Sequence, residues 1–210
     1  MNNTLYLASA SVQRARMLQE AGISFEPVLH TADEKSCAWD RDLEPLTRQL
    51  AQLKMDHVVL PILKDSPTHA FVLTADTLTM HNNQIIGKPH DHADAVSIIK
   101  RVRDGVWCGT AFCLERRELD GPAWHIQQRY TGYAHGWCSL AITDDEILLY
   151  FENLKRYSGF DYLKLAGAFS ITGYGAQFLK EIHGSYTAIL GLPMAELREG
   201  LNAVGFYIKD

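Results

Sequence analysis

The sequence has no long apolar run and no closely spaced cysteine pair, and each absence excludes a class of protein. A run of about eighteen apolar residues occurs nowhere, and the first residues, MNNTLYLASA, lack the basic and apolar parts of a signal peptide. We therefore expect a cytoplasmic protein with no membrane partner. The cysteines form no CxxC motif, so we expect all of them to be reduced and structural. They are Cys37, Cys108, Cys113 and Cys138.

Positive charge is also scarce. The formal net charge is -5 and the pI is near 6.0, which argues against a nucleic-acid polymer as partner. A local basic pocket for a free nucleotide would be invisible in that total. His90 and His92 form an HxH pair without a third ligand at a recognisable spacing, so we do not expect a zinc site there.

The 210 residues, 47% of them hydrophobic, suffice for one domain or two small lobes. Apolar periodicity predicts strands at 5–8, 24–29, 71–75 continued by 78–80, 84–86 and 205–208. It predicts helices at 11–20, 43–58, 91–102, 143–153 and 194–202. Residues 107–138 alternate aromatic and polar side chains, typical of antiparallel strands. The fold class is therefore α/β with a mixed sheet, in which roughly 105–140 form a strand-rich second lobe or a sheet extension.

Residues 5–14, LYLASASVQR, have the pattern of a phosphate-binding turn. An apolar strand leads into small hydroxyl residues, among them Ser9, and Ser11 is placed to cap the helix that follows. Arg14 would direct further donors at the same anion. Simple helix capping explains the same residues, so this motif alone leaves both interpretations open.

Two acidic residues are candidates for a catalytic or metal site. Asp76 follows the apolar strand 71–75, a position where α/β enzymes often place a functional carboxylate. Glu34 lies in a polar, acidic segment. A turn or an ion pair accounts equally well for Asp76, and solvent exposure for Glu34. Only their convergence would make a Mg²⁺ or Mn²⁺ site.

Two lysines are candidates for binding phosphate. Lys88 lies between Gly87 and Pro89, a stiff segment that holds the side chain in place. Lys54 falls on the flank of its helix expected to face solvent, where it is a surface residue unless the fold turns it toward a cleft.

Taken in order, these motifs resemble the Maf family of nucleoside triphosphate pyrophosphatases over nearly the whole chain. The motifs are Leu7-Ala8-Ser9-Ala10-Ser11 with Arg14, Asp33-Glu34, Lys54, Thr74-Ala75-Asp76-Thr77, Gly87-Lys88-Pro89, Ala166-Gly167-Ala168-Phe169 with Gly173, and Gly184-Ser185-Tyr186 leading to Gly191-Leu192-Pro193. Each is weak alone, but the ordered set is specific.

The resemblance implies a single domain over residues 1–210, with an elongated mixed sheet and two lobes around a central cleft, as in Maf and inosine triphosphatase-like folds. It also implies a homodimer, a divalent metal, Mg or Mn, and hydrolysis of a nucleoside triphosphate to the monophosphate and pyrophosphate. By this resemblance Glu34 and Asp76 hold the metal and the attacking water. Asp76 is the expected base, acting directly or through the metal.

The same resemblance gives the remaining positions to the triphosphate. Ser9 and Arg14 would bind it at the turn, with Ser11 beside them, and Lys54 and Lys88 would contact phosphate oxygens.

Several positions depart from the family pattern. The family usually has a second arginine where this chain has Gln13, and its Asp-Lys-Ala-Gly appears as Lys164-Leu165-Ala166-Gly167. Thr172 and Ala188 replace an expected Gln and Asn, and residues 101–110 do not align with the family motif. These departures motivate a second hypothesis, a diverged nucleotide-binding regulator with little or no activity that acts through a partner in cell division.

Base preference is open between a dTTP/UTP type and a methylated GTP type. Trp107, Phe169 and Tyr174 are possible stacking partners for a base, although core packing explains aromatic residues in such segments as well.

Overall fold

A computed structural model describes residues 3, 5–37, 42–61 and 68–208. Its centre is one mixed sheet of seven strands, ordered β2-β1-β5-β7-β8-β9 with β6 added to the side of β5. The strands of this sheet are β1 Leu5–Leu7, β2 Phe25–Pro27, β5 His69–His81, β6 Gln84–Ile86, β7 Val106–Asp120, β8 Ala123–Leu140 and β9 Leu179–Gly184. A small antiparallel pair comprises β3 Leu29–His30 and β4 Val58–Val59. The predicted mixed α/β class is confirmed.

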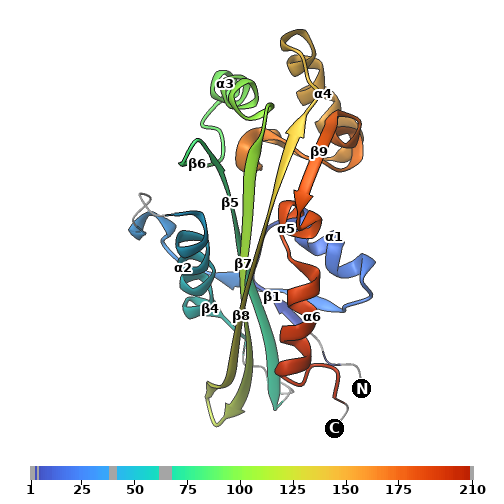
Figure 1. Ribbon diagram of the computed structural model, residues 1–210. Coiled ribbons are helices and arrows are strands. Elements are labelled where there is room, and N and C mark those ends of the chain that lie inside the picture. The colour runs from blue at the N-terminus through green and yellow to red at the C-terminus, as the bar shows by residue number, and fades with distance from the viewer. Residues whose placement is uncertain (1–2, 4, 38–41, 62–67, 209–210) are drawn as a thin grey trace.

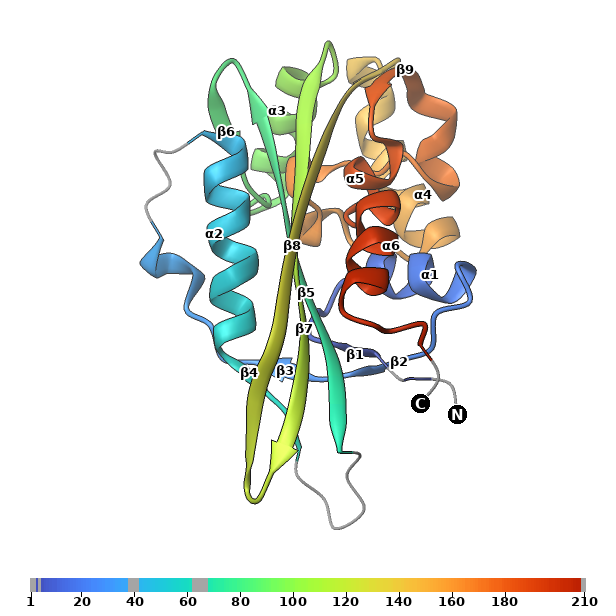
Figure 2. The same cartoon turned by 60° about the horizontal axis from the view of Figure 1, so that its bottom comes forward.

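Helices cover both faces of the sheet (Figures 1 and 2). They are α1 Val12–Glu20, α2 Leu43–Asp56, α3 His92–Val102, α4 Ile147–Ser158, α5 Tyr186–Leu190 and α6 Met194–Ala203. Helix α2 lies on one side of the long strands, and α1, α5 and α6 lie on the other, while α3 and α4 gather at one end. The molecule is therefore an elongated sheet whose two ends carry different helices.

Side-chain alternation along β5 divides the core between these layers. Phe71 and Leu73 pack toward α1 and α6, whereas Val72 packs with Met55 of α2 on the opposite face. A further cluster at the other end joins α3, α4 and the ends of β7 and β8. Alternate residues of one strand thus hold two helical layers in fixed positions.

The predicted antiparallel segment at 105–140 is confirmed as two strands. Strands β7 and β8 pair with each other along their whole length, and they also pair with β5 and β9 in the middle of the sheet. Figure 1 shows this hairpin running through both ends of the molecule. The segment is therefore part of the central sheet, and the division of the protein into two lobes stays a prediction.

Strand β5 differs from its prediction in a way that matters for function. The strands expected at 71–75 and 78–80 are one continuous element, so Asp76 lies inside a strand and not after its end. On one edge β5 pairs with β1 as far as Leu73, and with β6 only from Thr79 onward. Between these two partners none of the described strands covers the edge of β5, and this interval contains Asp76 and Thr77.

The predicted cap of α1, the capping box at Thr143 and the start of α6 are confirmed. The Ser11 hydroxyl accepts a hydrogen bond from the Arg14 N–H at 3.4 Å and caps α1, and Gly22 follows the helix with φ of +69°. The Thr143 N–H donates to the Glu146 carboxylate at 2.8 Å, which confirms the expected capping box. Helix α6 begins directly after Pro193, as expected.

Three predicted elements differ from the structure. The strand expected at 24–29 is divided: β2 ends at Pro27, and Leu29–His30 pairs with β4 instead. The helix expected at 43–58 ends at Asp56, since Val58–Val59 forms β4. The terminal strand expected at 205–208 is absent: these residues turn back after α6, and Phe206 packs on the core through a ring contact with Phe71 at 5.1 Å.

The described residues include all four cysteines and the helices given above. All four cysteines are buried and free. None of the helices within the described part of the chain has the length and apolar character needed to cross a membrane.

Candidate active site

A pocket of about 440 Å³ opens beside the uncovered interval of β5. One part of the lining comes from the turn between β1 and α1 together with α2 and β5, and a second wall comes from residues 159–161, 164–166 and 169–171. All seven residues proposed from the sequence line this pocket. They are Ser9, Ser11, Arg14, Glu34, Lys54, Asp76 and Lys88. Segments far apart in the sequence therefore converge on one cleft, although the role of each residue stays a prediction.

Lys54 joins the two carboxylates. Its Nζ lies 3.2 Å from Glu34 Oε1 and forms an ion pair with Asp76 Oδ1. Lys54 and Asp76 are only 8% and 6% exposed, so the surface position considered for Lys54 is wrong. The sequence did not reveal this, because it does not show that α2 packs on the sheet with the flank carrying Lys54 against β5.

A hydrogen bond between α2 and β5 fixes this arrangement. The Thr74 hydroxyl donates to the backbone oxygen of Ala51 at 2.7 Å, and both residues are buried. Ala51 lies one helical turn before Lys54, and Thr74 lies on the same face of β5 as Asp76. The contact holds the lysine and the carboxylate in register.

Arg14 is held by three hydrogen bonds within the protein. Nε donates to the backbone oxygen of Gly191 at 2.7 Å, Nη1 to the hydroxyl of Ser9 at 2.9 Å and Nη2 to the hydroxyl of Thr77 at 2.9 Å. Burial lowers the pKa of Arg14, although Asp76 and Glu34 oppose this effect. An arginine remains charged despite such shifts. Each terminal nitrogen keeps a second hydrogen for a ligand.

Lys88 is the most accessible of the predicted cations. It lies between β6 and α3, is exposed, and faces the pocket without an ion pair to another described residue. Its charge is therefore available to an incoming anion, unlike that of Lys54.

His30 was missed by the sequence analysis. It lies at the end of β3 and lines the pocket, and its Nδ1 is buried without a hydrogen-bond partner. Burial lowers the pKa of His30, the charge of Lys54 lowers it further, and Glu34 and Asp76 oppose both effects. The only signal in the sequence was a histidine four residues before Glu34.

The second wall of the pocket is more apolar than the one that carries the charged residues described above. Phe160 and Phe169 line it together with the turn at Leu165, and Asp161 and Lys164 form a loose ion pair there at 3.8 Å. Of the aromatic residues considered for base stacking, Phe169 alone lines this pocket in the described structure. Trp107 packs against His135, and Tyr174 packs against Tyr150 and Tyr157.

Glu34 and Asp76 are the two carboxylates in the pocket that could contribute ligands to a divalent cation. Among the described residues no group of three or more His, Cys, Asp or Glu side chains converges as a metal cage. Mg²⁺ in nucleotide enzymes is commonly held by one or two carboxylates together with phosphate oxygens. The two carboxylates therefore fit a cation that binds with a phosphorylated substrate, and they do not form a closed protein site.

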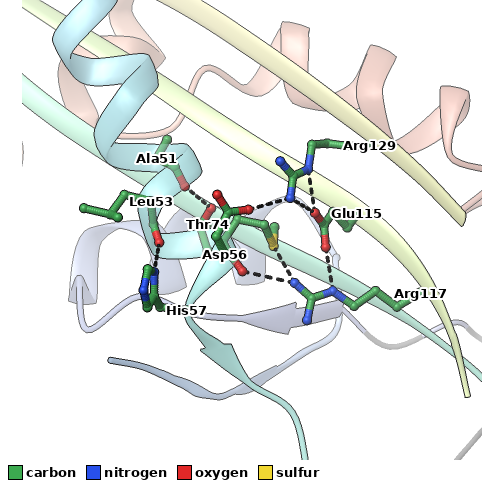
Figure 3. Close-up of polar contacts among 9 residues, drawn as sticks. Ala51, Leu53, Asp56, His57, Thr74, Glu115, Arg117 and Arg129 are labelled. Carbon is green, nitrogen blue, oxygen red and sulfur yellow. Dashed lines mark hydrogen bonds and ion pairs between the residues drawn. The ribbon is translucent and has the colours of Figure 1, made fainter. Parts of the chain in front are cut away.

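A second ionic cluster, formed by residues of α2, β7 and β8, lies outside the pocket (Figure 3). The Glu115 carboxylate is fully buried and accepts hydrogen bonds from Arg117 Nε at 2.5 Å and Arg129 Nε at 2.6 Å. Arg129 also pairs with Asp56, the last residue of α2, at 2.6 Å. Burial lowers the pKa of Arg129, but the hydrogen bonds to Asp56 and Glu115 outweigh it and leave that pKa raised.

The cleft thus brings the cations Arg14, Lys54 and Lys88 together with the carboxylates of Glu34 and Asp76. A family model described as Maf-like protein matches residues 4–204. The chain belongs to the Maf family, over nearly its whole length.

Curated relatives agree with this assignment. A protein of Geobacter sp. (strain M21) is 30% identical, with 97% of each chain covered, and one of Dechloromonas aromatica (strain RCB) is 32% identical, with 96% of this chain and 98% of the relative covered. A protein of Aquifex aeolicus (strain VF5) is 30% identical, with 91% and 90% covered. Each of these relatives is named dTTP/UTP pyrophosphatase.

Proposed function

We propose that this protein hydrolyses a nucleoside triphosphate to the nucleoside monophosphate and pyrophosphate. The observation that carries the proposal is the contact of Lys54 with both Glu34 and Asp76 in a pocket that also contains Arg14 and Lys88. The relatives named dTTP/UTP pyrophosphatase support dTTP and UTP as the first substrates to test.

The cations of the pocket suit a triphosphate tail. Such a tail carries about four negative charges near neutral pH, so its binding needs several positive groups that also stabilise the charge developing on pyrophosphate. Arg14 offers its remaining N–H groups from a fixed position, and Lys88 offers a free ammonium. Lys54 contributes charge from a position set by the two carboxylates.

Asp76 is the residue proposed to accept a proton from the attacking water. Hydrolysis at the α-phosphorus requires a base that can orient the water in line with the leaving pyrophosphate. Asp76 is fixed on a central strand by its ion pair with Lys54, yet it lines the cleft. Glu34, on a short 3₁₀ turn at Glu34–Ser36, faces the same lysine from the other side.

A divalent cation, Mg²⁺ or Mn²⁺, would be held by Glu34, Asp76 and phosphate oxygens. When bound, it would neutralise phosphate charge and polarise the phosphoryl group. The residues of the chain supply the remaining work: Arg14 and Lys88 orient the phosphates, and Asp76 holds the water.

The apolar wall with Phe160 and Phe169 is the proposed site of the base and ribose. A hydrophobic surface with a few polar groups is the usual environment for a nucleoside. The departures at Leu165 and Lys164 lie on this wall, so they bear on the choice of base more than on hydrolysis itself.

The experiment is to measure pyrophosphate release from dTTP, UTP, the other canonical nucleoside triphosphates and 7-methyl-GTP, with Mg²⁺ or Mn²⁺. Saturable release from one group of nucleotides is expected. Saturable binding without product from any of them would instead favour the regulator hypothesis. The homodimer implied by the family stays a prediction, to be checked by light scattering.

A further inference from the structure

A chain of hydrogen bonds leads from the pocket into the sheet. The Thr77 and Thr110 hydroxyl oxygens lie 2.8 Å apart on the adjacent strands β5 and β7, where these two residues are directly paired. Thr110 Oγ1 lies 2.6 Å from the backbone oxygen of Ala188 in α5. At the other end, Thr77 Oγ1 lies 2.9 Å from Arg14 Nη2.

The chemistry of the two ends determines the direction of every bond in this chain. The Ala188 carbonyl can only accept, so the Thr110 hydroxyl must donate to it. Thr110 must then accept from Thr77, whose own hydrogen is thereby used. Arg14 can only donate, so the Thr77 oxygen accepts from it. The order of donation is fixed from Arg14 through Thr77 and Thr110 to Ala188.

The chain also closes into a ring. Arg14 Nε donates to the backbone oxygen of Gly191, which directly follows α5, while Ala188 lies within the same short helix. Helix α5 is thus tied to Arg14 by one direct bond and by one path through two threonines. A cyclic arrangement of this kind restrains the guanidinium plane more strictly than a single hydrogen bond would.

We propose that Thr110 is a positioning residue for Arg14, which it orients toward a polyphosphate without touching the ligand. Thr110 is completely buried, and the pocket is lined by Arg14 and Thr77 but not by Thr110. The inference rests on the proposed function insofar as Arg14 is taken to bind phosphate.

The position of Thr110 explains why a hydroxyl is needed there. A valine has almost the same shape, but it can neither accept from Thr77 nor donate to Ala188. The Thr77 hydroxyl would then be free to rotate and to donate elsewhere, so it would no longer present its oxygen to Arg14 in one orientation. The guanidinium would retain its charge and lose its fixed direction.

The test compares Thr110→Val with Thr110→Ser, which keeps the hydroxyl. Thr47→Val is a matched control, since the buried Thr47 hydroxyl also donates to a backbone oxygen, that of Leu43, but within α2 and outside the pocket. The first readout is the dissociation constant of inorganic tripolyphosphate, measured by calorimetry. The second is the KM and kcat for dTTP, and thermal unfolding monitors the fold of all three variants.

The expected result is specific to Thr110→Val. Its tripolyphosphate affinity should fall about tenfold, and its KM should rise in parallel with kcat changed less than about twofold. Thr110→Ser should restore both values, and Thr47→Val should alter only stability. An affinity for Thr110→Val within about twofold of the unmodified protein, with the fold intact, would overturn the proposal.

The binding readout separates this inference from the proposed function. If the unmodified protein releases no pyrophosphate but binds tripolyphosphate, the proposed function fails and the affinity of Thr110→Val still decides the role of Thr110. If the unmodified protein does not bind tripolyphosphate at all, the role of Thr110 is overturned as well.

Discussion

The two ionic clusters near the end of α2 differ in their ratio of positive to negative charges. In the pocket, one lysine is shared by two carboxylates, Glu34 and Asp76. In the second cluster, outside the pocket, Arg117 and Arg129 form ion pairs with Glu115 and Asp56, so that each charge has a partner (Figure 3). The helix positions Lys54 and Asp56 that belong to these clusters are only two residues apart.

This difference separates a structural ion cluster from a candidate active site. Glu115 is completely buried and receives hydrogen bonds from both arginines, as a buried carboxylate requires. The pocket cluster retains an excess of negative charge while lying in an open cleft beside Arg14 and Lys88. We therefore expect the two pocket carboxylates to accept a further cation and Arg14 and Lys88 to accept an anion, whereas every charge of the balanced cluster is already paired.

The largest expected effect concerns Asp76. Asp76→Asn should lower kcat about a hundredfold or more, because the amide cannot accept the proton of the attacking water. The fold should persist, since Lys54 keeps Glu34 as a partner. Asp56→Asn, in the balanced cluster at the end of α2, is the control and should leave kcat unchanged. Equal activity of the two variants in pyrophosphate release would remove Asp76 from the mechanism.

The next effect is on stability and belongs to the balanced cluster. Glu115→Gln leaves two arginines beside a neutral amide, and it should lower the free energy of unfolding by about 3 kcal/mol without changing KM. Glu118→Gln is the matched control because Glu118 is exposed on the same strand. Chemical denaturation of both variants makes the comparison. Similar unfolding midpoints would show that the Glu115 cluster contributes little.

A double-mutant cycle tests how far the pocket cluster depends on its lysine. Lys54→Met leaves the buried Asp76 without its cation and should destabilise the protein, whereas Lys54→Met combined with Asp76→Asn removes both charges. The double variant should recover about 1–2 kcal/mol relative to the sum of the single changes. Denaturation curves for the four proteins measure this coupling, and strict additivity would mean that the ion pair contributes no stability.

The smallest effect is a pH dependence from His30. Because its pKa is lowered in the folded protein, the unfolded chain binds more protons below the ordinary histidine pKa of about 6.5. Stability should therefore fall as the pH drops through that value toward the folded pKa, and His30→Gln should reduce the slope. Unfolding measured at intervals from pH 7.5 to 5.5 tests this. A slope unaffected by the substitution would exclude His30 as its source.

The sequence predicted much of the fold because many of its signals are local. Ser11 caps α1 through a bond to a residue three positions away, and Thr143 and Glu146 cap their helix over the same spacing. The wrong predictions depend on distant partners: the chain end at 205–208 was assigned a strand because its apolar pattern cannot distinguish a strand from a turn packed on the core.

For the candidate site, the residue types were predictable and the contacts were not. The local residue patterns together with the resemblance to one family selected all seven residues that line the pocket. The burial of Lys54 and the hydrogen bonds of Arg14 could not be inferred, because each depends on which elements lie on which face of β5.

The sequence by itself determined the alternation that builds a mixed sheet, the helix caps and the set of charged side chains available for chemistry, since these follow from spacing along the chain. Only the tertiary structure decided that β5 runs unbroken past its two edge partners, that Lys54 is shared by two carboxylates, and that Arg14 is hydrogen-bonded to Thr77, which in turn contacts Thr110. The physical reason is that strand register and helix placement bring together groups whose separation in sequence carries no information about their distance in space.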